Sequence, residues 1–172
     1  MSRSLFFSAL LVCACGLLSP STAGAQMKVG VINLQRAVLG TEDIKKASND
    51  MQAKFKPRQD ALDKLQKEMA DIQAKLQSPQ LPPAQQTELT AEGQRKQREA
   101  QRITEDLQAD VERDRNEVLQ RAAQRMSEVV KKMADEKGLD LVVDTTNAVF
   151  YKPALEITEE AIAAYDKTFP AK

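Results

Sequence analysis

Asp140 and Asp144 are the side chains of this sequence whose type and spacing come nearest to a reactive pair, and both belong to the short apolar segment LDLVVD. If the segment is a strand, alternation places the two carboxylates on one face, where a pair of acids could act as proton donor and acceptor. The sequence contains no histidine, however, and histidine is the commonest acid–base group near neutral pH. We therefore interpret both aspartates as solvated acids at a sheet edge, and we expect that the protein is not an enzyme.

The first residues have the three-part form of a cleaved secretory signal. Arg3 provides the positive start, an apolar run extends from Leu5 to Leu18, and Ala23-Gly24-Ala25 fits a cleavage site. The run is about 14 residues long, shorter than the roughly 20 residues that a membrane-spanning helix needs. We expect residues 1–25 to be removed on export and the mature chain to have no transmembrane segment.

Removal of the signal would also remove both cysteines, Cys13 and Cys15. Without cysteine or histidine, the mature chain is predicted to have no disulfide, no metal site and no cofactor. An alternative is a lipoprotein signal, which Val12-Cys13-Ala14-Cys15 faintly resembles. In that case Cys15 would be acylated and retained.

The charges of the chain are balanced and interspersed. It carries 25 basic and 25 acidic side chains, and loss of Arg3 with the signal would leave a net charge of −1. Because nucleic-acid-binding proteins normally carry a marked basic excess, we expect no nucleic-acid partner. Only 4% of the residues are aromatic, which argues against a large globular core. Abundant charge of both signs is instead typical of long solvated helices.

A first long helix is predicted from Thr41, a good N-cap residue, to Gln77, over about 54 Å. Its apolar residues recur at intervals of seven, three and four, which is the a/d pattern of a coiled coil. They are Phe55, Leu62, Leu65, Met69, Ile72 and Leu76. We expect this helix to pack along one narrow stripe.

A second long helix is predicted from Ala84 to Lys137, over about 81 Å, with Gly138 as the residue that ends it. Its apolar residues follow an eleven-residue interval, which gives about 3.67 residues per turn and favours a straight or slightly right-handed course. The two series are Leu107, Val118, Val129 and Val111, Ala122, Met133. The two halves of this helix should therefore pack differently.

The stretch QSPQLPPAQQ between the two helices is either a linker between separate units or the tip of a hairpin. A linker would leave both apolar stripes in water, whereas folding back at residues 78–83 buries them against each other. Folding back also returns LDLVVD to the start of the chain. We therefore predict a helical hairpin arm over residues 41–137.

The flanking residues, 26–40 and 138–172, are predicted to form a small body. KVGVIN, LDLVVD and AVFY read as three strands of one sheet, and a helix that starts at Thr158 would cover it with Ile162 and Tyr165. The fold class is therefore α+β, with a long antiparallel coiled-coil hairpin projecting from a small β-sheet body.

A sheet this small leaves exposed edges that favour pairing with other chains, so we expect oligomerisation through the body. The candidate residues are Val29, Val31, Leu141, Val143, Val149 and Tyr151.

This order of segments resembles the Skp/OmpH family of periplasmic chaperones. The resemblance covers the entire mature chain, and its most specific part is LVVD-x-x-NAV-x-Y, from Leu141 to Tyr151. It implies a homotrimer in the periplasm, in which strands of three subunits form the body and three hairpins surround a cavity. In that cavity, family members hold unfolded outer-membrane β-barrel proteins without ATP. An alternative function is a structural coiled-coil adaptor of the cell envelope.

Basic residues of the arm are the candidate contacts with such clients, because many clients are acidic. They are Lys64, Lys67 and Lys75 on the first helix and Arg95, Lys96, Arg98 and Arg102 on the second. Each could instead solvate its helix and pair with an acid one turn away. The best-known family members are strongly basic whereas this chain is neutral, which leaves contact with lipopolysaccharide an open question.

Overall fold

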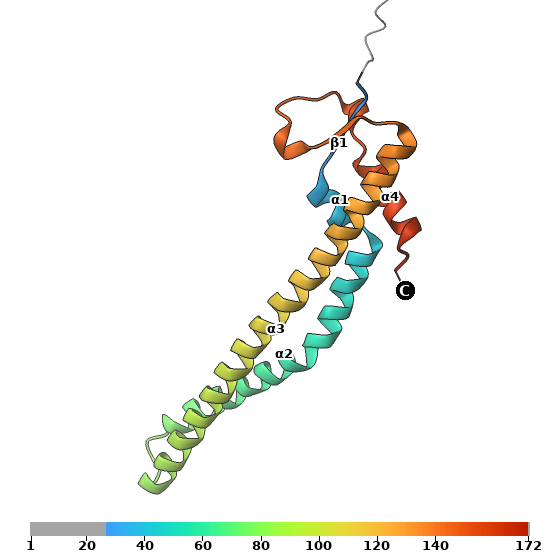
Figure 1. Cartoon of the computed structure of the whole chain (residues 1–172). Helices are drawn as coiled ribbons and strands as arrows, with labels where there is room; N and C mark the ends of the chain where they lie inside the picture. The colour runs from blue at the N-terminus through green and yellow to red at the C-terminus, as the bar shows by residue number, and fades with distance from the viewer. Residues whose placement is uncertain (1–26, 172) are drawn as a thin grey trace, which may run out of the picture.

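The computed structural model describes residues 27–171, so the predicted signal and Cys15 lie outside the described part. One long helix leaves a small body and a second long helix runs back to it beside the first, as Figure 1 shows. The elements in chain order are β1 (Val29–Ile32), α1 (Leu34–Gly40), α2 (Glu42–Leu76), α3 (Pro83–Lys137), β2 (Leu141–Asp144), the 3₁₀ turns η1 (Thr145–Asn147) and η2 (Pro153–Leu155), and α4 (Thr158–Thr168). The predicted α+β fold, a helical hairpin on a small sheet, is confirmed.

Helix α2 begins where the sequence predicts it to begin. The Thr41 hydroxyl accepts a hydrogen bond from the backbone N–H of Ile44 (3.4 Å) and donates one to the carbonyl of Val38 (2.9 Å). Pro57 lies inside this helix. Because proline has no N–H for the carbonyl of Ala53 and its ring crowds the preceding turn, it bends a helix. Figure 1 shows α2 changing direction about midway along its length.

Helix α3 also has the predicted ends. It starts at Pro83, one residue before the predicted start, where a missing N–H has no cost. It ends at Gly138, whose φ of 61° is the left-handed conformation that glycine adopts without steric penalty. The N–H of Leu139 then closes the last turn on the carbonyl of Ala134 (2.9 Å).

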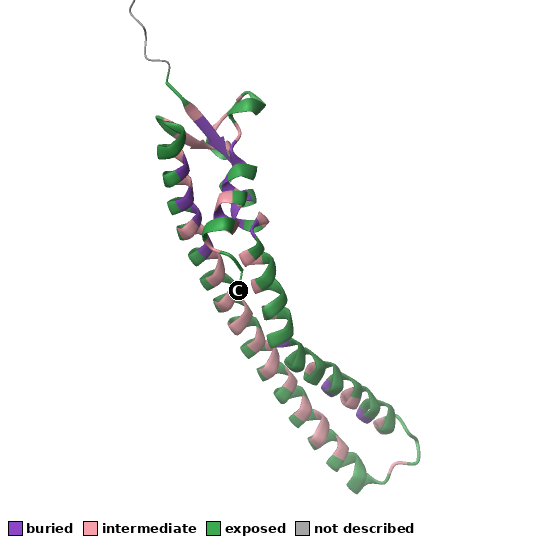
Figure 2. Ribbon diagram, turned by 90° about the vertical axis from the view of Figure 1, so that its right-hand side faces the viewer, coloured by how far each residue is buried: buried purple, intermediate pink, exposed green. Residues whose placement is uncertain are grey.

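The predicted a/d stripe of α2 does face α3. Phe55, Leu65 and Ile72 are buried, and the other three members, Leu62, Met69 and Leu76, are half-buried. Figure 2 shows these few buried positions on α2, with half-buried positions along α3 and an otherwise exposed surface. The hairpin prediction, with its tip between the two helices, is therefore confirmed.

The core of the protein lies at the body end of α3. Ala122, Met126, Val129 and Met133 are buried there against β1, α1 and α4. Tyr165 of α4 is fully buried and Ile162 packs against the same cluster, as expected for a covering helix. The members of the eleven-residue series nearer the tip are only half-buried. The two halves of α3 thus pack differently, as predicted.

The predicted three-stranded sheet is wrong, because the sheet has two strands. β1 and β2 pair in parallel, with Val29 opposite Leu141. Residues 148–151, predicted as a third strand, form no ladder within the described chain, and Val149 and Phe150 stand out in solvent. The second edge of β1 is instead used by a single bridge from Glu156 to Val31.

Both aspartates of the LDLVVD segment are structural. Asp140 accepts a hydrogen bond from the backbone N–H of Lys28 (2.7 Å). Asp144 accepts one from the N–H of Leu34 (3.1 Å) and two from Thr146, and these bonds hold the pKa of its carboxyl below the usual range. The Thr146 bonds turn the chain away from the sheet directly after β2, which explains why no third strand follows.

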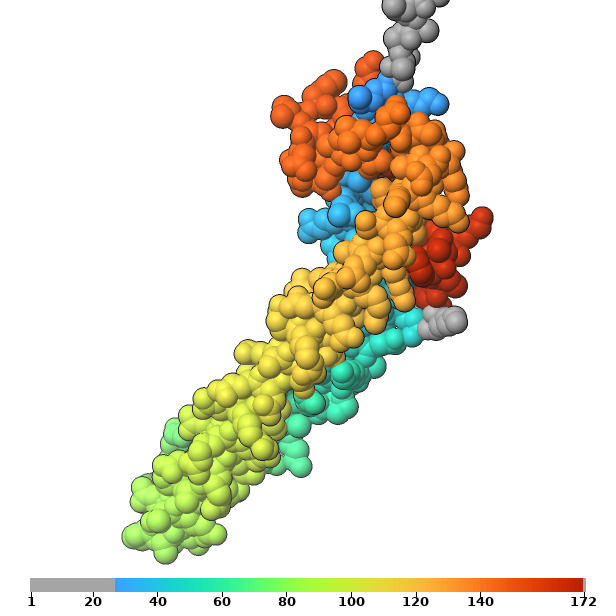
Figure 3. Space-filling view, in the orientation of Figure 1, coloured from blue at the N-terminus to red at the C-terminus, as the bar shows by residue number. Residues whose placement is uncertain are grey.

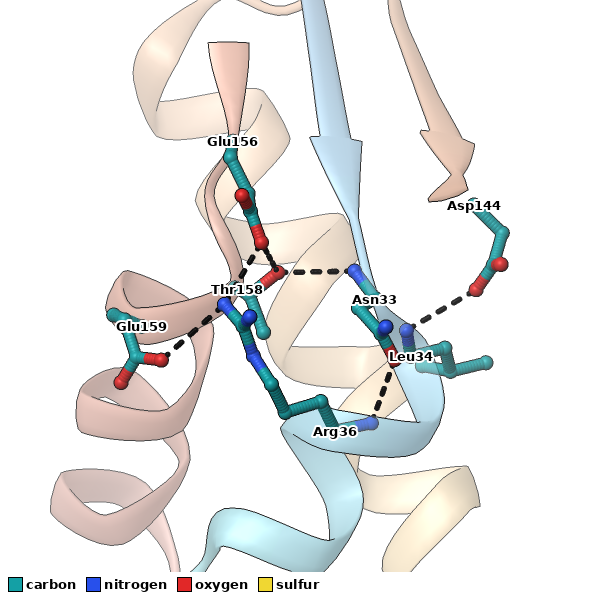
Figure 4. A network of polar contacts seen from close by, with 7 residues as sticks. All are labelled: Asn33, Leu34, Arg36, Asp144, Glu156, Thr158 and Glu159. Atoms are coloured by element: carbon teal, nitrogen blue, oxygen red, sulfur yellow. Dashed lines mark hydrogen bonds and ion pairs between the residues drawn. The ribbon is translucent and has the colours of Figure 1, made fainter. Parts of the chain in front are cut away.

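Further polar contacts fasten the end of β1 to the C-terminal segment (Figure 4). The Thr158 hydroxyl accepts a hydrogen bond from the N–H of Asn33 (2.9 Å), and Arg36 forms ion pairs with Glu156 (2.8 Å) and Glu159 (3.3 Å). The body is thus assembled from the two ends of the described chain, with the arm inserted between them.

Candidate functional site

The seven basic residues predicted to contact clients fall into two groups in the structure. Lys64 and Lys96 form ion pairs with Glu68, at 3.9 and 2.7 Å. Lys96 also lies 3.7 Å from Glu92. Its hydrogen bond lowers the pKa of the Glu68 carboxyl, and the same bond raises the pKa of Lys96. Lys96 therefore links the two helices of the arm rather than standing free.

The other five basic residues are exposed, and none forms an ion pair within residues 27–171. Arg95, Arg98 and Arg102 follow one another at intervals of three and four, so they share one face of α3. The remaining two are Lys67 and Lys75 on α2. Such side chains can contact carboxylates of a bound chain, each only weakly and with screening by salt.

A cluster of charges joins the two helices beside the bend at Pro57. Asp110 pairs with Arg58, and Asp114 pairs with Lys54. Arg113 contacts both acids, at 2.8 and 3.2 Å. The hydrogen bond from Arg58 lowers the pKa of Asp110, and the one from Lys54 lowers the pKa of Asp114.

A second network, which sequence reasoning missed, locks α4 to the base of the arm. The Tyr165 hydroxyl donates a hydrogen bond to Asp43 (2.9 Å), and Arg125 forms an ion pair with the same carboxylate (3.0 Å). The Arg125 guanidinium lies 4.9 Å from the centre of the Phe169 ring. Burial raises the pKa of Tyr165. The three elements come from distant parts of the chain, so only the position of Asp43 in the first turn of α2 was visible in the sequence.

The six residues predicted to form the oligomerisation surface differ in their exposure to solvent. Val31 is 3% exposed and belongs to the interior of its own chain. Val29, Val143 and Tyr151 are half-buried, whereas Leu141 and Val149 are exposed at 48% and 107%. Phe150, which the prediction did not include, is 84% exposed. In Figure 3 the segment after β2, which carries Val149 and Phe150, projects from the body on the side away from α4.

Residues 27–171 hold no group of three or more acidic, cysteine or histidine side chains that could bind a metal ion. None of the helices described there is both long and apolar enough to cross a membrane.

The fold and the sequence together define the class of protein. The family model described as "Outer membrane protein (OmpH-like)" matches residues 28–165. Since the match spans most of the chain, the protein belongs to the OmpH-like family. The resemblance inferred from LVVD-x-x-NAV-x-Y and the hairpin is thereby confirmed.

Two similar proteins support this assignment. A Skp-like protein from Pseudomonas aeruginosa is 23% identical over 158 residues, which cover 91% of this chain and 94% of the relative. The crystal structure of an OmpH-like protein from Caulobacter crescentus superposes with a TM-score of 0.63 at 19% identity, over 86% of this chain and 89% of the other. The second likeness shows that the two proteins share a fold.

Proposed function

We propose that the protein is an ATP-independent periplasmic holdase that binds unfolded outer-membrane proteins between its arms and prevents their aggregation. The observation that carries the proposal is the arm itself. Helices of 35 and 55 residues project from a small body, and only a thin stripe of their surface is buried. A surface this large that is not used for the protein's own packing is available to a partner, and membership of the OmpH-like family favours an outer-membrane protein as that partner.

The proposal includes a homotrimer assembled through the body. Within the described chain, the outer edge of β2 has no partner strand, and residues 148–151 carry the exposed Val149 and Phe150 but pair with nothing. If residues 148–151 of one copy pair with β2 of the next copy, the open edge of β2 and the unpaired segment each gain a partner. A contact between two different surfaces closes into a ring when the rotation between copies allows it. Three arms around such a ring would enclose the client.

The basic residues of the arm favour weak contact at many points. Lys67 and Lys75 of α2, and Arg95, Arg98 and Arg102 of α3, have no acidic partner within residues 27–171, while the tip, SPQLPP, carries no charge. Each exposed contact with a carboxylate is worth at most about 1 kcal/mol. Many such contacts retain a client and still let it leave without an energy source.

The test begins with the chain that starts at Gln26. Its mass in solution is measured, and light scattering then follows a urea-unfolded outer-membrane β-barrel protein diluted into buffer with and without it. We expect a trimer that keeps the client soluble in the absence of nucleotide. A monomer or dimer that leaves the client to aggregate would overturn the proposal. Stoichiometric binding of one envelope protein, without protection of unrelated clients, would favour a structural adaptor instead.

A further inference from the structure

A groove runs between α2 and α3 on the body side of the bend at Pro57. It has a volume of about 420 Å³, within the range of sites that bind small ligands or side chains. Met51 and Phe55 of α2 line it from one side, Val118 and Leu119 of α3 from the other, and Leu39 of α1 closes the end nearest the body. The groove belongs to neither polar cluster described above.

The bend explains why this space exists. Nearer the tip the two helices bury Leu65 and Ile72 between them, and at the body Ala122 and Met126 of α3 are buried against β1, α1 and α4. Between these levels Phe55 is buried, but Met51, Val118 and Leu119 beside it are only half-buried. Pro57 bends α2 beside this level, where the groove lies between the two helices.

The chemistry of the groove is apolar with a single charge. Arg115 is the only charged side chain among its lining residues, and it forms no ion pair within residues 27–171. The other side of the same hairpin segment differs. The pocket there is lined by five charged side chains, and four of them pair, since Lys46 pairs with Asp50 (2.6 Å) and Arg125 with Asp43 (3.0 Å); the fifth is Arg121.

We propose that this groove binds apolar segments of unfolded client chains that carry a carboxylate next to the apolar side chains; this inference rests on the function proposed above. Apolar side chains would displace water from the half-buried Met51, Val118 and Leu119, and the carboxylate would meet Arg115. The exposed side chain of Leu39, 48% accessible, continues the apolar surface from the groove onto α1.

Charge argues against a second copy of this chain as the occupant. The exposed apolar segment that the protein itself offers is AVFY, residues 148–151, within a stretch from Thr145 to Leu155. That stretch contains no acid and one base, Lys152. Lys152 would approach Arg115 with like charge, whereas a client carboxylate would approach it with opposite charge.

The first experiment measures the affinity of the mature protein for two short synthetic peptides. Both alternate leucine or valine with polar residues; one carries a glutamate and the other a glutamine in its place. We expect the glutamate peptide to bind about threefold more tightly, the size of an exposed ion pair. Arg115→Gln should abolish this preference. Arg121→Gln is the matched control, because Arg121 is exposed on the same helix but lines the opposite pocket.

A preference that survives Arg115→Gln, or that Arg121→Gln removes equally, overturns the inference. Val118→Gln tests the apolar part, and both peptides should then bind about tenfold more weakly, as for loss of one buried valine. Because Val118 also contacts α2, the helix content of this variant is compared with that of the wild type before its affinity is interpreted.

The second experiment separates the groove from the proposed function. A photo-crosslinking residue replaces Gln52, which lines the groove, or Ala53, which is exposed but lies outside it. With the unfolded barrel protein as client, we expect crosslinks at position 52 and few at position 53. If the wild type keeps the client soluble but position 52 captures no client, or captures only a second copy, the groove inference fails and the holdase function stands. If the client aggregates with the wild type, the holdase function itself fails.

Discussion

The two ends of α3 show two ways of stabilising the same helix. Its last turns bury Ala122, Met126, Val129 and Met133 against three other elements, whereas none of residues 83–121 is buried. The distal part of the arm depends on one stripe of α2 and on ion pairs such as Lys96–Glu68. Because local stability follows buried apolar contacts, the arm should open from its tip long before the body unfolds.

The largest effect is expected from a core substitution at the body end. Met126→Ala should lower the free energy of unfolding by about 3 kcal/mol, because this fully buried side chain leaves a cavity among α1, α3 and α4. The measurement is denaturant unfolding at fixed protein concentration, because the trimer proposed above would make stability concentration-dependent. Ser127→Ala, at the exposed neighbouring position, serves as control and should change little.

A substitution in the distal stripe should act locally. Leu65→Ala is expected to lower the opening free energy of the distal arm by about 2 kcal/mol, at the low end for a buried leucine, since one side of the seam faces water. Amide hydrogen exchange should report faster exchange in residues near 65 and 96 and unchanged exchange around Met126. If Leu65→Ala speeds exchange equally in both regions, the arm and the body form one cooperative unit, and the arm does not open before the body.

Loss of one hydrogen bond at the base of the arm should have a smaller effect. Tyr165→Phe removes the donor to Asp43, which keeps its ion pair with Arg125. We expect a loss of about 1.5 kcal/mol, the lower value for a hydrogen bond to a charged group. Exchange should quicken in α4 and in the first turns of α2, while the distal arm remains as in the wild type. No change in α4 would show that its packing alone holds it in place.

The smallest effect is expected from a fall in pH that protonates Asp110 and Asp114. The pKa values of Asp110 and Asp114 are lowered in the folded arm, so their stabilising contribution is complete above about pH 4, the usual aspartate pKa. It is lost as pH falls below that value through the lowered pKa values. Spin labels on the two helices near Pro57 should therefore report wider separation only below about pH 4. In the double variant Asp110→Asn, Asp114→Asn, the distance between the two labels should already be larger at neutral pH. If that distance matches the wild type, these ion pairs do not keep α2 and α3 together beside Pro57.

Most of the arm could be predicted from the sequence because its signals are local. Thr41 and Gly138 mark helix ends by their own chemistry, and the spacing of Leu62, Leu65 and Ile72 fixes which face of α2 is buried. Pro57 is an equally local signal from which the bend could have been predicted. The groove beside it, and the role suggested for Arg115, follow only when the bend is known.

Other features depend on relations that a single sequence does not contain. The segment AVFY has strand-forming residues, but whether it pairs within the chain depends on the turn that Asp144 makes and on which element occupies the second edge of β1. Lys96 and Glu68 meet only because the hairpin has one particular register, across 28 residues. The sequence offered Lys96 either a client contact or an acid one turn away, such as Glu92, and could not show its closer partner, Glu68, on the other helix.

The pairing of β1 with β2 also sets an order of events as the chain is made. Val29 lies opposite Leu141, 112 positions later, so the first strand has no partner until nearly the whole chain has emerged. Contacts this distant in sequence form slowly, and until they do, β1 leaves both edges open to unwanted pairing. The newly made chain is thus itself prone to aggregation for a time, and its helices, which need only near neighbours, should form first.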